Sequence, residues 1–345
     1  MRVFITPCDT SEGGWNHGCL SLQRVAELAD RRVHNVVSSA DEAQIVIVTD
    51  MREDDHFGRL LRANSIVKRY PDKSFVYDRT DRPIGFVRGV YTSPPRTLLD
   101  LGRYQTGCYL TAISEWRNPF VSADAETSME KDLLFSFVGR NSSPVRGQLL
   151  AHNFGRSDVV VTDVSSLYDH WDGTSPQRDV YQRRYVDISK RSRFVLCPRG
   201  HGNSSERLFE VMEMGLVPVI LSDGWVPPRG PRWQDFSVTI LERDVTRLVP
   251  ILERYGDDWF DMGHNARQNW LDWFSPPKQF NYIVDSCIEI MGTAKVNEKR
   301  FRRAWPLLLL LARTRRVVNR LRTFAAARFS RRRHVLKDRG SRQPG

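Results

Sequence analysis

The chain has 345 residues, of which 40% are hydrophobic and 27% are charged. This length suits two medium-sized domains, and the apolar content excludes a disordered chain. The net charge of +11 is unevenly spread, because residues 299–345 hold sixteen of the 52 Lys and Arg but one acidic residue, Asp338. The first 298 residues hold 36 basic and 40 acidic residues. A nearly neutral body argues against a nucleic-acid-binding core, so the basic tail needs a separate explanation.

The cysteine spacing and the N-terminal residues indicate the cellular compartment in which the protein is located. No two of the five cysteines form a paired motif, which predicts buried thiols in a reducing environment. They are Cys8, Cys19, Cys108, Cys197 and Cys287. Residues 1–7 predict a strand rather than the apolar region of a signal peptide, and no apolar run approaches the ~20 residues of a membrane span. We therefore expect a cytoplasmic protein, peripheral at most at the inner face of the membrane.

The first third of the chain alternates apolar runs with helical patterns. Strands are predicted at residues 3–5, 44–50 and 73–78, and helices at residues 21–30 and 57–70. Strands that alternate with helices predict crossover units and a parallel sheet.

A polar stretch at residues 122–128 predicts a linker, after which the strand pattern restarts. The later strands are expected at residues 133–140, 159–162, 193–198, 216–223 and 236–241. The sequence therefore predicts an α/β protein with two doubly wound sheets that face a cleft. The expected domains are residues 1–125, residues 126–298 with a return helix, and a basic amphipathic tail at residues 299–345.

The segment from residue 194 to 228 carries the strongest chemical signal. A buried strand ends at Pro198 and is followed by the glycine loop 199–202. Asn203 is expected to cap the next helix, with Glu206 in the capping-box position, and Gly215 to end it. A strand, a glycine loop and a helix N-terminus together predict a phosphate-sized anion site.

Arg207 and Glu210 are three residues apart on that helix, so they share one face. An arginine there can bind a diphosphate through forked hydrogen bonds, and the carboxylate can accept from ribose hydroxyls. The alternative is an exposed ion pair on a capped helix.

Three segments, 194–202, 205–212 and 215–223, resemble the core motif of the exostosin-type glycosyltransferases (glycosyltransferase family 47). The similarity extends to residues 135–140, 233–244 and 267–274, and more weakly to residues 42–48. It covers residues 130 to 290 well and the earlier part thinly. Familiar animal and plant members carry an N-terminal membrane anchor. We expect none here, which suits a cytosolic enzyme rather than one in the Golgi lumen.

The resemblance implies a GT-B fold, with an acceptor domain followed by a nucleotide-sugar-binding domain across a cleft. It implies transfer of a sugar from a nucleotide-sugar to a glycan or lipid-linked acceptor, with inversion and without an essential metal or other cofactor. The donor would be bound by residues around the motif and after the strand at 133–140. These are Gly139, Arg140, Arg199, Gly200, His201, Gly202, Ser204, Ser205, Arg207 and Glu210.

An inverting transfer needs a base that accepts the proton of the acceptor hydroxyl. The polar, glycine-rich loop at residues 9–18 offers Glu12, Asp9 and His17 as candidates, followed by Asp50 and Asp78 at later strand ends. Each of these residues also fits an ordinary turn or cap.

Trp225 follows a strand end and is a candidate for stacking on a sugar, although single tryptophans more often lie in a core. No D-x-D-type carboxylate motif indicates a bound metal. From residue 301, apolar residues recur at helical spacing with arginines around them, which predicts a helix in an anionic membrane interface. RNA binding and a solvated disordered tail remain alternatives for this segment. For the whole protein, the alternative is a non-catalytic nucleotide-sugar-binding or membrane-associated scaffold.

Overall fold

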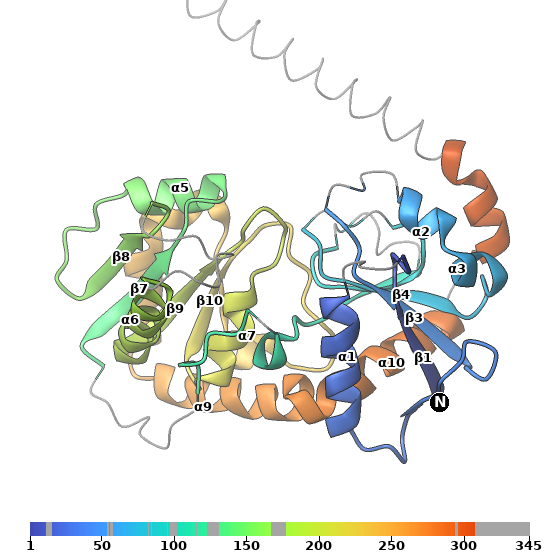
Figure 1. Ribbon diagram of the computed structural model, residues 1–345. Coiled ribbons are helices and arrows are strands. Elements are labelled where there is room, and N and C mark those ends of the chain that lie inside the picture. The colour runs from blue at the N-terminus through green and yellow to red at the C-terminus, as the bar shows by residue number, and fades with distance from the viewer. Residues whose placement is uncertain are drawn as a thin grey trace, which may run out of the picture. The chain divides into compact units, whose positions relative to one another are not determined.

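A computed structural model gives the fold (Figure 1). It describes residues 1–307 except residues 12–15, 54, 56–57, 82, 84, 95, 97–101, 115, 123–130, 167–176 and 294–295. The chain divides into two compact units, Met1–Val296 and Asn297–Gly345. The described part of the second unit is a helix at residues 298–307, and the rest of the predicted amphipathic tail lies outside the described residues. Most of the predicted linker at residues 122–128 lies outside them too.

The first sheet contains six parallel strands in the order β2-β1-β3-β4-β5-β6. The strands are β1 (Arg2–Pro7), β2 (Asn35–Val36), β3 (Ile45–Thr49), β4 (Ser74–Asp78), β5 (Gly89–Tyr91) and β6 (Tyr104–Thr106). Strands β1, β3 and β4 confirm the three that the sequence predicted. β2, β5 and β6 have two or three residues each, too few for their apolar pattern to stand out.

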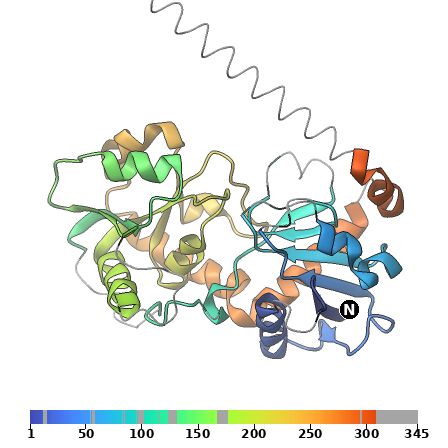
Figure 2. The same ribbon diagram turned by 45° about the horizontal axis from the view of Figure 1, so that its top comes forward.

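Two helices from opposite parts of the chain cover one face of this sheet. They are α1 (His17–Leu28) and α10 (Pro276–Thr293), the orange helix that lies beside α1 in Figures 1 and 2. Leu22 of α1 and Ile283 of α10 pack with Ile47 of β3 in one buried cluster. All five residues of β3 and of β4 are buried, so the opposite face is covered as well.

Two predicted helices differ from the structure at their ends. α1 begins four residues earlier than expected, because the Asp50 carboxylate accepts hydrogen bonds from the backbone N–H groups of Gly18 and Cys19 at 2.6 and 2.8 Å. The single helix expected at 57–70 is two short helices, α2 (Arg59–Ala63) and α3 (Ser65–Arg69). Asn64 divides them, since its side chain caps the start of α3.

The second sheet contains five parallel strands in the order β11-β10-β9-β7-β8. The strands are β7 (Leu133–Gly139), β8 (Val159–Asp163), β9 (Ser192–Pro198), β10 (Val217–Leu221) and β11 (Val238–Thr239). All five confirm predicted strands. The helices of this region are α5 (Pro144–Ala151), α6 (Gln177–Arg191), α7 (Glu206–Glu213), α8 (Leu248–Leu252) and α9 (Trp259–Asn269). Short 3₁₀ turns and one π-helical turn complete it: η1 (Thr111–Ile113), η2 (Trp233–Asp235), η3 (Glu242–Arg247), η4 (Glu253–Tyr255) and the π-helical η5 (Trp270–Phe274).

Helices cover both faces of the second sheet because side chains alternate along its strands. Leu196 of β9 packs in one cluster with residues of α5 and α8, and its neighbour Val195 packs in another with α6 and α7. The doubly wound α/β class that the sequence predicted is therefore confirmed. The five cysteines are all buried and free, as expected. In the described residues, no helix is both long and apolar enough to cross a bilayer.

Candidate active site

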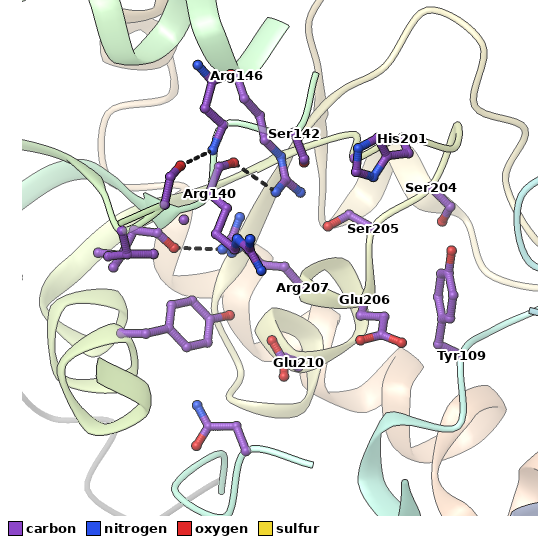
Figure 3. A pocket seen from close by; sticks show the side chains of 18 of the residues that line it. Tyr109, Arg140, Ser142, Arg146, His201, Ser204, Ser205, Glu206, Arg207 and Glu210 are labelled. Atoms are coloured by element: carbon purple, nitrogen blue, oxygen red, sulfur yellow. Dashed lines mark hydrogen bonds between the residues drawn. The ribbon is translucent and has the colours of Figure 1, made fainter. Parts of the chain in front are cut away.

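A cavity of about 1040 Å³ lies beyond the carboxyl ends of strands from both sheets (Figure 3). From the first sheet it is lined by Glu53, Arg79 and Asp81, which follow β3 and β4. From the second sheet it is lined by the residues that follow β7, β8 and β9 and by α6 and α7. Cavities of this size hold small organic ligands, and the edge is the one at which open α/β sheets bind them.

The cavity gathers eight of the ten residues predicted to bind the donor. They are Gly139, Arg140, Gly200, His201, Ser204, Ser205, Arg207 and Glu210. The other two predicted residues, Arg199 and Gly202, do not line the cavity. The guanidinium of Arg199 forms an ion pair with Glu242, with Nε 2.7 Å from Oε1, so its hydrogen-bonding groups are occupied elsewhere.

The glycine loop is joined to the first sheet rather than left open. The backbone N–H groups of Asn203 and Ser204 donate to the Ser93 hydroxyl, with distances of 2.6 and 3.3 Å. A Cβ atom on Gly202 would lie 2.4 Å from Ser93 Oγ and 2.6 Å from Asp81 Oδ1. Gly202 is therefore needed for this close approach, not for contact with a ligand.

Helix α7 starts differently from the prediction. Its N-cap is Ser205, whose side chain makes no capping hydrogen bond, and the expected cap at Asn203 is wrong. The Asn203 carbonyl instead accepts a hydrogen bond from the Ser222 hydroxyl. The C-terminal end is as predicted, because Gly215 follows the helix with φ of +72°.

Arg207 is held by the edge of β7 and by two aromatic rings. Its Nη2 donates to the carbonyl of Val138 at 2.7 Å, and the guanidinium carbon lies 4.7 Å from the ring centre of Phe137 and 5.2 Å from that of Tyr185. Nε and Nη1 are buried and have no hydrogen-bond partner in the part of the chain that the structure describes. The alternative of an exposed ion pair with Glu210 is wrong, because both residues are half-buried and, within the described chain, the guanidinium donates to Val138 and to no carboxylate.

Arg146, which the sequence analysis missed, lies beside Arg207 (Figure 3). Its guanidinium donates to the carbonyls of Pro198 and Arg140 and has no carboxylate partner in the described chain. Burial, together with a smaller repulsion by Arg207, lowers the pKa of Arg146 to about 9. Two adjacent guanidinium groups without counter-ions make this wall of the cavity strongly attractive to an anion.

Glu210 has an unusual proton affinity. Burial, and to a smaller extent the negative charge of Glu206, raises the pKa of its carboxyl to about 7, although Arg207 and the Tyr185 hydroxyl oppose the shift. Burial also raises the pKa of Glu206, which solvent reaches through the cavity. A carboxyl with such a pKa is a hydrogen-bonding group poised near neutral pH.

We expect Glu210→Gln to stabilise the ligand-free protein more at pH 8 than at pH 5. The pKa in the folded protein is above the ordinary value of 4.5, so the folded state binds more protons between pH 4.5 and 7. Charging Glu210 thus costs stability as the pH rises through this range. Thermal melting at both pH values checks this, with Glu27→Gln on the exposed face of α1 as control. An equal change in Tm at both pH values would contradict it.

Helix α6 and the end of β8 form the wall next to Glu210. Tyr181, Gln182 and Val164 line it, and the amide Nε2 and Oε1 of the buried Gln182 have no hydrogen-bond partner among the described residues. This combination of aromatic, apolar and amide groups suits a planar heterocycle.

The structure does not place the predicted bases in the cavity. Asp9 accepts hydrogen bonds from Ser11 and His17 begins α1, and neither lines the cavity; Glu12 lies outside the described residues. Asp50 caps α1. Asp78 accepts from the backbone and hydroxyl of Thr80, and burial raises its pKa to about 6.

Trp225 also lies away from the cavity, which corrects its expected contact with a sugar. It is 7% exposed and packs edge-on against Trp233, with ring centres 5.0 Å apart, in a hydrophobic cluster of the second sheet. A turn follows β10, in which the Trp225 N–H donates to the Ser222 carbonyl at 3.3 Å.

Two doubly wound sheets that share a ligand-sized cavity define a GT-B-like α/β fold. Residues 103–255 match the Exostosin GT47 domain, so the predicted resemblance to the exostosin-type glycosyltransferases is confirmed.

Three relatives illustrate the similarity. A probable glycosyltransferase of Arabidopsis thaliana is 32% identical over 190 residues, which are 50% of this chain and 39% of the relative. A probable glucuronoxylan glucuronosyltransferase of the same plant is 42% identical over 90 residues, or 24% of this chain and 20% of the relative. The Exostosin-1 homolog of Caenorhabditis elegans is 28% identical over 142 residues, or 37% of each chain. The chain thus spans less than half the length of these relatives.

Among solved structures, WaaG, a glycosyltransferase involved in lipopolysaccharide biosynthesis, aligns with 84% of this chain and 99% of its own. The sequence identity is 10% and the TM-score is 0.36. The fold assignment rests on the two sheets themselves.

Proposed function

We propose that this protein is a glycosyltransferase that moves a sugar from a nucleotide-sugar to a glycan or lipid-linked acceptor. The observation that carries the proposal is that the Arg207 guanidinium lines the cavity with two buried nitrogens, which have no hydrogen-bond partner among the described residues. An unpaired buried cation is costly unless a ligand compensates it, and a diphosphate supplies the required charge.

The remaining walls fit the other parts of a nucleotide-sugar. We place the diphosphate beside Arg207, Arg146 and Arg140, and the ribose hydroxyls at Glu210. The nucleobase would lie on the wall of Tyr181 and Gln182. The sugar would then extend toward the glycine loop and the first sheet, from which the acceptor approaches.

In this arrangement the reaction is a single displacement with inversion at the anomeric carbon. The guanidinium groups and the N-terminus of α7 stabilise the charge that develops on the leaving diphosphate. Since these groups can take the place of a metal ion, we propose that the transfer is metal-independent, and activity that survives EDTA is the expected result. Membrane attachment through residues 299–345 and a cytoplasmic location remain part of the proposal.

Thermal melting and donor cleavage test this function directly. We expect one nucleoside diphosphate among UDP, GDP, CDP and ADP to raise Tm by roughly 5 °C at a hundredfold excess over its Kd. Nucleotide release from the matching sugars is then measured, with UDP-glucuronic acid included because one relative is a probable glucuronosyltransferase. Binding without release from any donor would favour the non-catalytic scaffold, and absence of any binding would overturn the donor site.

A further inference from the structure

The wall of the cavity that comes from the first sheet carries two carboxylates, Glu53 and Asp81, that donor binding leaves unused. Both follow strands of that sheet, on the side from which the acceptor would approach. The other carboxylates of the cavity lining, Glu206 and Glu210, belong to α7 on the donor side.

Glu53 fixes the position of the Asp81 backbone through a hydrogen bond. Its Oε1 accepts a hydrogen bond from the Asp81 N–H at 2.7 Å, which joins the loops after β3 and β4. This hydrogen bond uses the Glu53 carboxylate for positioning, whereas the Asp81 carboxylate extends toward the second sheet.

Asp81 meets the glycine loop across the cavity. Its Oδ2 lies 3.8 Å from Nδ1 of His201, and its Oδ1 lies 2.6 Å from the position that a Cβ of Gly202 would occupy. Asp81 and His201 are 36% and 65% exposed, so the carboxylate is open to a substrate. The carboxylate therefore reaches the space between the anion-binding wall and the first sheet.

We propose that Asp81 is the catalytic base, an inference that rests on the proposed function. The acceptor oxygen forms a bond to the anomeric carbon of the donor while the bond from that carbon to the diphosphate oxygen breaks. The proton of the acceptor hydroxyl passes to the Asp81 carboxylate, and the nucleoside diphosphate leaves with the electron pair. Glu53 is a positioning residue, and His201 lies beside the carboxylate on the donor side.

Cleavage of a donor with water as acceptor tests the assignment without a known acceptor, because water must lose a proton to the same base. The probe is the nucleotide-sugar that the wild-type protein hydrolyses fastest. We expect Asp81→Asn to lower the rate about 10²- to 10⁴-fold, the usual contribution of a general base. The Kd for the nucleoside diphosphate should stay within about threefold, since the cationic wall is intact.

Chemical rescue separates a base from a merely structural group. Formate should restore part of the rate of Asp81→Ala and leave the wild type unchanged. Glu53→Ala should lower kcat with little change in KM, and Glu53→Gln, which keeps the Oε1 acceptor, should restore it. Asp9→Asn is the matched control, since Asp9 does not line the cavity and its variant should keep the wild-type rate.

Failure of the proposed function and failure of the Asp81 assignment would give different results. If the wild-type protein neither binds nucleotides nor cleaves donors, the proposed function is wrong. If the wild type is active and Asp81→Asn keeps a rate within threefold, or Glu206→Gln alone abolishes it, the function stands and the assignment of Asp81 is overturned.

Discussion

Replacing Arg207 by methionine should weaken binding of the nucleoside diphosphate about 10- to 100-fold. Each hydrogen bond from a charged group contributes about 1.5–3 kcal/mol, and 1.4 kcal/mol changes Kd tenfold. Methionine keeps an apolar chain between Phe137 and Tyr185, where the guanidinium now packs, so the fold should survive. Isothermal titration calorimetry with the nucleotide that raises Tm most gives the two Kd values.

Arg199→Met is the matched control, because the sequence predicted the same role for both arginines. The structure places the Arg199 guanidinium on Glu242, away from the cavity lining. Its loss should lower Tm slightly and leave Kd unchanged. Equal losses of affinity in the two variants would show that the anion site is not the one described around Arg207.

Adding one methyl group at Gly139 should also reduce nucleotide binding at least tenfold. A Cβ there would lie 2.9 Å from Nη2 of Arg207 and 2.7 Å from Cζ of Phe137, closer than side-chain atoms approach one another. Gly139→Ala must therefore move the guanidinium from its bond to Val138, and such overpacking costs about 1–3 kcal/mol of stability. Both the melting temperature and the nucleotide Kd should change.

Gly292→Ala gives the corresponding control within α10. Apart from the adjacent residues and the helix's own backbone, no atom of the described residues lies within 4 Å of the position of its Cβ, so alanine should be neutral or stabilise the helix by up to about 1 kcal/mol. Nucleotide affinity equal to the wild type in Gly139→Ala would mean that the position of Arg207 does not depend on this glycine.

The longer strands of the fold follow from the sequence, and the short ones do not. Ile45–Thr49 and Phe194–Pro198 are apolar runs of full strand length, and both are strands in the structure. Gly89–Tyr91 is a strand because its neighbours on either side supply hydrogen bonds, which no local pattern reveals. The break at Asn64 has the same origin, since a capping side chain competes with helix continuation.

For the candidate site, the sequence predicted the donor-binding residues Arg207 and Glu210. Their spacing alone places them on one face of a helix, independently of the rest of the chain. The direction in which a side chain points after a turn is not determined by its neighbours in the sequence alone. Arg199 turns to Glu242 and Trp225 enters the core because of residues far along the chain. Asp81 was missed since it lies three residues beyond the strand end at Asp78, where a sequence pattern carries no signal.

Helix α10 makes the first sheet depend on a segment that follows the whole second sheet in the sequence. The apolar face that contains Ile47 and Phe75 is covered in part by Phe280 and Ile283, which are synthesised only after the whole second sheet. A fragment that stops before Pro276 would leave that face open to water and prone to self-association. During translation the first sheet can therefore complete its fold only after α10 has been synthesised. Truncations that keep every residue of the cavity but remove α10 should yield insoluble protein.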